Sequence, residues 1–237
     1  MRDSAHGTRD STGTAPAELG SVAVIIPVGP GDRSWRTLLD ILDRLAPTLE
    51  RRLVFAHGDL QSRPRAPSER WTESSRGRAR QQNAGAAGID SDWLWFVHAD
   101  SRPEQSTLRA LGEFVSRGED AIGYFDLKFV DDGPALMWLT AAAANWRSRT
   151  LGMPFGDQGL VLPRNRFYEL GGFDESRPYG EDHALIWQAR RSGVPIKRIP
   201  AALGTSARRY RDQGWLLTTL RHQRLTWVQA WQESRSR

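Results

Sequence analysis

The chain has 237 residues, a hydrophobic content of 39% and no cysteine, which excludes disulfides and thiolate metal sites. Its 33 basic residues, nearly all arginine, exceed its 28 acidic residues, which suits phosphate-bearing substrates, an anionic membrane surface or nucleic acid. No stretch approaches the roughly 18 apolar residues of a membrane span, and the length suits one α/β domain with appendages.

The first 20 residues are rich in Ser, Thr, Gly and Ala, and they lack the apolar stretch of a secretory signal. We therefore predict a disordered tail over residues 1–20. Three short apolar runs predict buried strands, at residues 21–27, 53–56 and 93–97. Helices are expected between them, the second over residues 77–88, and the polar stretch 58–75 with its two prolines is predicted to be a loop.

This alternation of strands and helices predicts an α/β domain with a parallel sheet and right-handed crossovers. Alternating apolar residues at 125, 127 and 129 predict a half-buried strand in the second half of the chain. Further strands are expected at residues 159–162 and 194–199, and helices at residues 107–115, 135–149, 167–170 and 181–191.

The strand at 93–97 runs directly into His98 and Asp100. A carboxylate at the carboxyl end of such a strand lies where open α/β sheets bind ligands. Oxygen ligands suit Mg²⁺ or Mn²⁺, which bind through one or two carboxylates together with substrate phosphates. Asp100 is therefore a candidate metal ligand, and the alternative is that it caps the following helix or turn.

Three more polar clusters lie at the ends of predicted elements. Asp157 precedes a strand, Glu181 and Asp182 begin a helix, and Arg208 and Arg209 follow the last strand. An acidic pair at a helix start often serves only the helix dipole, and paired arginines are usually solvated. Together, however, the clusters supply a carboxylate base for a hydroxyl nucleophile and cations for a phosphate leaving group.

Arg76, Arg80 and Asn83 share one side of the helix at 77–88, because they are spaced i, i+4 and i+7. This side could face a nucleotide or water.

In combination, these motifs resemble the family 2 glycosyltransferases of the GT-A fold, over roughly Val22 to Tyr210. The resemblance is carried by Val24-Ile25-Ile26-Pro27-Val28, Arg78-Ala79-Arg80-Gln81-Gln82-Asn83-Ala84-Gly85, His98-Ala99-Asp100, Phe125-Asp126-Leu127, Gly156-Asp157-Gln158-Gly159, Leu170-Gly171-Gly172-Phe173 and Glu181-Asp182. Within that family the chain is most similar to a bacterial subgroup associated with radical SAM and selenium-related genes, on its Gly-Asp-Gln-Gly and Thr-Ser-Ala-Arg-Arg strings.

The resemblance implies a GT-A domain over residues 21–212, which is an α/β fold with a mixed, mainly parallel central sheet. It also implies a nucleotide-diphosphate sugar donor, a divalent metal (Mn²⁺ or Mg²⁺) and inversion at the anomeric carbon. Asp100 would be the metal ligand of a DxD-like element, Asp182 the base with Glu181 in support, and Asp157 a residue of the acceptor side. The residues expected at the donor are Pro27, Asp59, Arg80, Asn83, His98, Arg208 and Arg209.

The chain departs from the family pattern in three places. Residues 29–32 replace an Asn-Glu-like pair after the first strand, and residues 56–59 replace the usual acidic and glycine residues after the second, where Asp59 is the nearest substitute. Both changes affect the expected nucleotide site. Ala184 stands where the family has another aspartate two positions after Asp182, and this change affects the catalytic assignment.

Two other functions compete with glycosyl transfer. A sugar-phosphate nucleotidyltransferase would need a glycine-rich phosphate loop after the first strand, and residues 29–33 match it poorly. A non-catalytic GT-A-fold scaffold at a membrane surface would tolerate the altered loops, although the intact acidic motifs oppose it. Nucleic acid is not an expected partner, because the tryptophans lie mostly in apolar stripes rather than among basic residues.

Residues 213–237 are predicted to form a C-terminal amphipathic helix. Its apolar stripe consists of Leu217, Leu220, either Trp227 or Val228, and Trp231. A basic helix with tryptophan on its apolar side is typical of interfacial anchoring, and the alternatives are that it roofs the acceptor site or packs on the sheet as core. We expect a cytoplasmic protein, peripheral on the inner face of the membrane if this helix is an anchor. The acceptor is unknown, and a lipid-linked one is expected only if the protein binds liposomes.

Overall fold

Strand β1 (Val22–Val28) is the centre of the fold, and all seven of its residues are buried. The computed structural model describes residues 17–59, 61–62, 71–177 and 179–208. β1 pairs in parallel with β2 (Glu50–Ala56) on one side and with β4 (Trp93–Phe96) on the other. β3 (Trp71–Ser74) continues the parallel sheet beyond β2. A continuous apolar run is what such a doubly covered strand requires.

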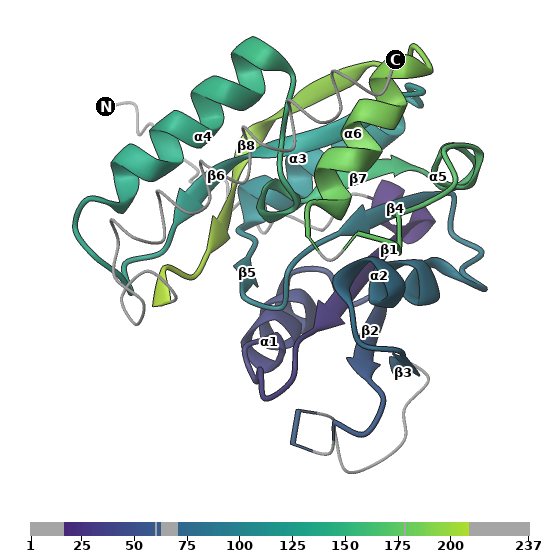
Figure 1. The fold of residues 1–237 in the computed structure, drawn as a ribbon. Helices are drawn as coiled ribbons and strands as arrows, with labels where there is room; N and C mark the ends of the chain where they lie inside the picture. Colours follow the sequence, from purple (N-terminus) through teal and green to yellow (C-terminus); the bar gives the residue numbers. More distant parts are fainter. Residues whose placement is uncertain (1–16, 60, 63–70, 178, 209–237) are drawn as a thin grey trace, which may run out of the picture.

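The other half of the sheet mixes strand directions (Figure 1). β7 (Leu160–Pro163) is antiparallel to β4 and to β6 (Ile122–Phe129), and β6 is parallel to β8 (Ile196–Thr205). The two-residue strand β5 (Ser101–Arg102) pairs with the end of β8. The order is β3-β2-β1-β4-β7-β6-β8-β5, so the predicted α/β class with a mixed, mainly parallel sheet is confirmed.

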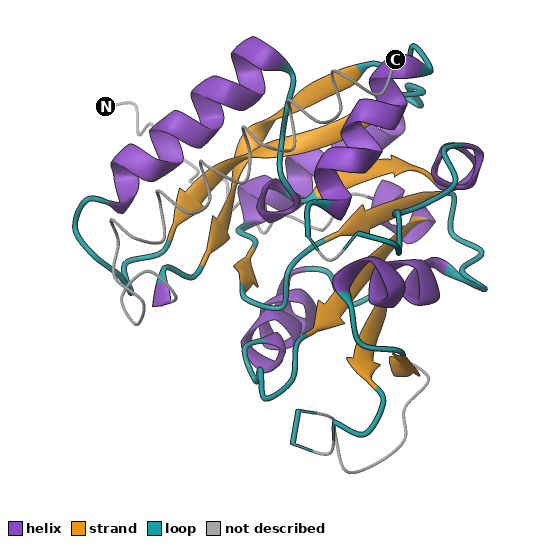
Figure 2. Ribbon diagram, viewed as in Figure 1, coloured by secondary structure: helices purple, strands orange, loops and turns teal. Residues whose placement is uncertain are grey.

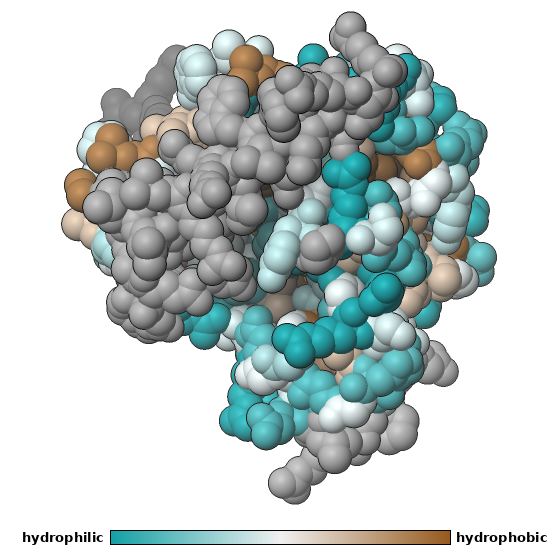
Figure 3. All heavy atoms as spheres, viewed as in Figure 1, coloured by the Kyte–Doolittle hydropathy of each residue, from teal (hydrophilic) through white to brown (hydrophobic). Residues whose placement is uncertain are grey.

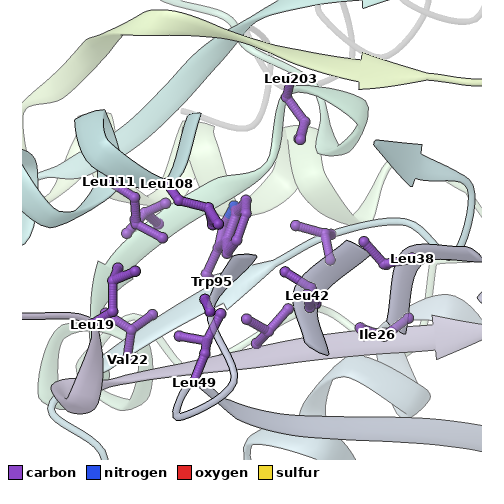
Figure 4. Packing of buried hydrophobic residues seen from close by; sticks show 14 of the residues in the cluster. Leu19, Val22, Ile26, Leu38, Leu42, Leu49, Trp95, Leu108, Leu111 and Leu203 are labelled. Carbon is purple, nitrogen blue, oxygen red and sulfur yellow. The ribbon is translucent and has the colours of Figure 1, made fainter. Parts of the chain in front are cut away.

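Helices cover both faces of this sheet (Figure 2). Alternate residues of β1 point to opposite faces, as in any strand, and they belong to two separate hydrophobic clusters. The first cluster includes α1 (Trp35–Leu45) and α3 (Gln105–Ser116), and Figure 4 shows Trp95 in its middle. The second face is covered by α2 (Arg78–Ala86), α5 (Arg164–Glu169) and α6 (Glu181–Arg191).

α4 (Met137–Leu151) lies beside β6 rather than over the two clusters. Asn145 of α4 accepts a hydrogen bond from the backbone N–H of Leu127 at 2.7 Å and donates one to the carbonyl of the same residue at 3.0 Å. The side chain thus satisfies both backbone groups of a β6 residue that β7 does not reach, since β7 pairs with β6 only at Gly123. Among the described residues, no helix has the length and apolar content needed to cross a bilayer.

α2 lies unusually close to the sheet. Gly85 leaves no room for a side chain, since an added Cβ would be 2.5 Å from a methyl of Ile25 and 2.8 Å from one of Val54. The buried amide of Gln81 donates to the carbonyls of Val28 and Val54, at 2.8 and 2.7 Å. The two hydrogen bonds of Gln81 hold the first half of α2 against the carboxyl-terminal halves of β1 and β2.

Two sequence expectations need correction, and one lies outside the described residues. The predicted tail extended to residue 20, but Ala17–Ser21 form a 3₁₀ helix (η1), because Leu19 is buried in the core at 1% exposure. The predicted loop at 58–75 ends in β3, whose polar residues suit a strand at the sheet's edge. The C-terminal helix expected at 213–237 and Arg209 lie outside the described residues.

The close approach of α2 to the sheet leads to a prediction about the stability of the fold. We expect Gly85→Ala to destabilise the fold by about 1–3 kcal/mol, since overpacking outweighs the better helix propensity of alanine. Urea unfolding followed by circular dichroism measures the change. Gly20→Ala is the control, because nothing lies within 4 Å of an added Cβ there. Equal unfolding midpoints for the two variants would show that α2 is not packed this tightly.

Candidate active site

The carboxyl ends of β1 and β4 form the edge of the sheet at which the predicted residues gather. From β1 the chain continues to β2 and β3 on one side of the sheet, and it then returns to β4 on the other side of β1. In open α/β sheets, ligands bind at such a reversal of strand order. Pro27 lies near the end of β1, and His98 and Asp100 follow the end of β4. The structure thus places these three residues at a position suited to ligand binding.

Asp100 lies in a tight turn between β4 and β5. The backbone N–H of Ser101 donates to the carbonyl of His98 at 3.0 Å, and Asp100 is half-buried between the buried residues Ala99 and Ser101. Asp100 does not cap α3, because the capping box of that helix consists of Glu104 and Thr107. The expectation that Asp100 caps the following helix is therefore wrong, whereas capping of the turn stays an alternative.

The turn at residues 155–159 enters the same region from the other half of the sheet. Its anchor is Gln158, which is fully buried. The side-chain oxygen of Gln158 accepts from the Ser148 hydroxyl at 2.6 Å and from the Phe155 N–H at 3.2 Å, and its side-chain nitrogen donates to the Phe125 carbonyl at 3.0 Å. These bonds tie the turn to α4 and β6, and they fix the positions of Gly156 and Asp157.

Asp182 closes onto this turn from the start of α6. Its Oδ2 accepts a hydrogen bond from the Gly156 N–H at 2.6 Å, and its Oδ1 accepts one from the His183 N–H at 2.8 Å. Burial acts to raise the pKa of Asp182, but His183, the Gly156 N–H and Arg78 outweigh it and lower this pKa below its ordinary value. Asp182 is therefore a carboxylate at neutral pH.

His98 and Asp182 flank the same glycine. A Cβ on Gly156 would lie 3.1 Å from Nε2 of His98 and 3.2 Å from Oδ2 of Asp182. Residues that are 84 positions apart in the chain therefore meet around one backbone segment. The motif at the end of β4 and the motif at the start of α6 form one site.

Glu181 has a different environment from Asp182. It is only 4% exposed, and Nη1 of Arg78 donates to its Oε1 at 3.3 Å. Burial and the neighbouring Asp182 raise the pKa of Glu181, while Arg78 opposes the rise. The pair Arg78–Glu181 joins the first turn of α2 to the first turn of α6, so Glu181 is placed to hold Arg78 at the site. Arg78 was not among the residues selected from the sequence.

Asp157 has a raised pKa. Burial is the main cause, Asp182 and Asp100 add to it, and Arg147 and Arg78 oppose it, so that the pKa is about 6. Its Oδ1 is buried and has no hydrogen-bond partner among the described residues. Arg147 lies 3.5 Å above the ring of Phe155, and its presence near Asp157 was not predicted from the sequence.

A second group of charges includes Asp100 and Arg102. Arg102 is half-buried; burial lowers its pKa, Arg208 adds to this effect, and Asp100, Asp132 and Asp32 oppose it. An arginine remains charged despite such a shift. Arg208 donates to the hydroxyls of Ser206, at 2.9 Å, and Ser34. Arg102 therefore lies near Asp100, and Arg208 lies near Arg102. Arg102 could have been noticed in the sequence, two residues after Asp100.

Three of the predicted donor residues have other contacts. Asn83 accepts from the N–H of Phe173 and donates to the carbonyl of that residue, both at 2.9 Å, so it holds the loop after α5. Arg80 lies 3.8 Å from the carboxylate of Glu175 in the same loop. Asp59 accepts a hydrogen bond from the N–H of Ser62 at 3.2 Å. Burial acts to raise the pKa of Asp59, but its hydrogen bonds to Ser62 and neighbouring residues lower this pKa.

No side-chain cluster in the described part of the chain could hold a metal alone, since no three His, Cys, Asp or Glu residues are suitably grouped. A divalent cation that binds through one carboxylate needs phosphate oxygens to complete its ligands. Asp100 fits that arrangement, because it is a half-buried carboxylate near Arg102, which would attract a phosphate group.

Comparison with known proteins adds no family assignment. No protein-family model matches the chain, and no curated protein matches its sequence.

The raised pKa of Asp157 predicts a pH-dependent stability. The folded state holds this proton more tightly than the unfolded chain, whose carboxyl titrates near 3.8, so the stabilisation is present below about pH 4 and is lost as the pH rises through about 6. Asp157→Asn removes the cost of burying the carboxylate. We therefore expect the Tm of the variant, relative to the original protein, to increase as the pH rises from about 4 to about 7, when measured by differential scanning fluorimetry with EDTA.

Asp120→Asn is the control for this measurement. Its hydrogen bond to Arg166 lowers the pKa of Asp120 against a small opposing effect of burial, so its stabilisation changes only at acidic pH. Its Tm difference should stay constant where that of Asp157→Asn rises. A constant difference for both variants would mean that Asp157 is ionised throughout the range.

Proposed function

We propose that this protein is a glycosyltransferase that moves a sugar from a nucleotide-diphosphate donor to a hydroxyl acceptor, with inversion at the anomeric carbon. The observation that carries the proposal is the meeting of Asp182 and His98 around Gly156, with Asp100 nearby, at the carboxyl ends of β1 and β4. A base, a metal-binding carboxylate and arginines for a phosphate group then share one site. The resemblance of the motifs to family 2 glycosyltransferases supports the same function.

Asp182 is the best candidate for the base. It is ionised at neutral pH and half-buried, whereas Glu181 is almost fully buried and engaged with Arg78. Its two backbone hydrogen bonds hold the carboxylate in one orientation, which general base catalysis requires. Asp182 would take the proton of the acceptor hydroxyl.

The reaction would then proceed as a single displacement. As the acceptor oxygen loses its proton to Asp182, it forms a bond to the anomeric carbon. The bond from that carbon to the diphosphate oxygen breaks on the opposite side, and the nucleotide diphosphate departs with the electron pair. Arg102 and Arg208 would bind the charge that develops on the leaving phosphates, since guanidinium groups match phosphate geometry.

A divalent cation, Mn²⁺ or Mg²⁺, would be held by Asp100 together with the diphosphate, and when bound it would neutralise part of the leaving group's charge. Asp157 would serve the acceptor side. A carboxyl group with a pKa near 6 exists in both protonation states close to neutral pH, so it can either donate a hydrogen bond to the acceptor substrate or accept one from that substrate.

The proposal is tested by incubating the protein with a panel of nucleotide sugars and Mn²⁺ or Mg²⁺. Thermal shift reports donor binding, and slow release of the nucleotide diphosphate reports hydrolysis in the absence of the acceptor. A sugar-phosphate nucleotidyltransferase would instead form a nucleotide sugar and release pyrophosphate. Absence of both a thermal shift and donor hydrolysis across the panel would count against the proposal.

Asp182→Asn should reduce transfer or donor hydrolysis on the order of 10²–10⁴-fold, because it removes a positioned base. Donor binding by thermal shift should persist, since the asparagine oxygen can still accept from Gly156. Asp120→Asn, which changes an exposed carboxylate paired with Arg166, is the matched control. Turnover equal to that of the original protein would reject Asp182 as the base, and Glu181 would be tested next.

Asp100→Ala should abolish metal-dependent nucleotide binding in isothermal titration calorimetry while the protein stays folded. The control is Asp92→Ala, which removes an exposed carboxylate at the opposite end of the same strand. If Asp100→Ala binds nucleotide with unchanged affinity in the presence of metal, Asp100 is not a metal ligand.

A further inference from the structure

The outer face of α4 is apolar, although it points to solvent. This face consists of Trp138, Leu139, Ala142, Ala143 and Trp146, and all five residues are exposed, with the two tryptophans at 64% and 63%. The residues that α4 turns inward are instead small or flexible: Met137, Ala141, Ala144 and Ser148. An ordinary surface helix has the reverse distribution. Figure 3 shows brown side chains along the edge of the molecule that α4 occupies in Figure 1.

We propose that the outer face of α4 seats the protein on an anionic lipid surface. Tryptophan and leucine side chains on one side of a helix are typical of interfacial insertion, because the indole ring is apolar but carries one polar N–H. A contiguous exposed apolar patch marks an interaction surface. The inference rests on α4 itself and does not depend on the proposed enzyme activity.

The charges around α4 favour an anionic partner. Residues 133–156 contain no aspartate or glutamate. Of their two arginines, Arg147 lies on the inner side of the helix near Asp157, whereas the side chain of Arg149 is 50% exposed and pairs with Asp126 at 2.7 Å. At the end of the helix, Arg190 donates from its Nη1 to the carbonyl of Leu151 at 2.6 Å. Basic residues next to an apolar helix face are attracted to the negative surface of a membrane.

A second copy of the chain fits this face less well than a lipid surface does. A helix of 15 residues is about 22 Å long and about 10 Å wide, which gives a footprint on the order of 220 Å². Stable dimers bury roughly 800 Å² on each partner, so α4 alone is too small. Insertion of one helix face into a lipid surface has no such minimum area.

The position of α4 links this surface to the candidate active site. Its inner side carries Ser148, which holds Gln158, and Arg147, which acts on Asp157. The lipid-facing and site-facing sides of α4 are therefore about one helix diameter apart, roughly 10 Å. The last step rests on the proposed function. If that function holds, the acceptor side of the site would lie near the membrane, where a lipid-linked hydroxyl could reach it.

The test is flotation of the full-length protein with vesicles that contain phosphatidylglycerol, compared with vesicles of phosphatidylcholine alone. We expect binding to the anionic vesicles. The double variant Trp138→Ser, Trp146→Ser should lower the partition coefficient on the order of tenfold or more, since two exposed tryptophans no longer insert. Because both side chains are exposed, circular dichroism should show an unchanged fold. Trp138→Phe, Trp146→Phe should retain most of the binding.

The matched control is Trp227→Ser, Trp231→Ser, which removes two tryptophans from the C-terminal segment. Loss of binding in this control, with full binding by Trp138→Ser, Trp146→Ser, would overturn the proposal and assign the contact to the C-terminal segment. Absence of vesicle binding by the original protein would also overturn it. A third outcome that would overturn it is a dimer, measured by sedimentation velocity, that the α4 substitutions dissociate, because the outer face of α4 would then bind a second copy of the chain. Vesicle binding is measured without substrate, so failure of the glycosyltransferase proposal would leave this result unaffected.

Discussion

The candidate active site depends on the buried side chain of Gln158. Its amide joins α4, the backbone of the turn at 155–159 and strand β6 through Ser148, Phe155 and Phe125. A buried amide left without partners is costly, so this turn can adopt few other conformations. The fixed turn presents the Gly156 N–H to Asp182, and that bond positions the carboxylate of the proposed base. One structural residue thus orients the carboxylate of Asp182, which comes from a different element.

Asp100 interacts electrostatically both with Asp157 and with Arg102. In the proposed displacement, a carboxylate would take the proton of the nucleophile, and arginines would bind the negative charge that develops on the leaving group. Burial acts to raise the pKa of both Asp157 and Asp182. At Asp182 the charge of His183 and two backbone N–H bonds outweigh burial, whereas Oδ1 of Asp157 has no hydrogen-bond partner among the described residues.

Helical spacing predicted the side of a helix but not what covers it. Asn83 and Arg80 share a side of α2 as expected, yet that side faces the loop after α5, where Asn83 bonds to the backbone of Phe173. Arg78, at the start of the same helix, reaches Glu181 instead. The contacts of these residues depend on where α5 and α6 pack, which is set by burial over the whole second face of the sheet. Local periodicity carries no information about that packing.

The sequence by itself determined the central strands β1 and β4, but it missed β3 and the full length of β8. Apolar runs are long enough to define β1 and β4, and polar residues that follow them, such as Asp100, must lie at the sheet's edge. Only the tertiary structure decided which ends meet. β7 inserts antiparallel between β4 and β6, so the turn with Gly156 reaches the same edge as His98 and Asp182. Strand order and direction follow from burying both faces of the sheet at once, which is a property of the whole chain rather than of any segment.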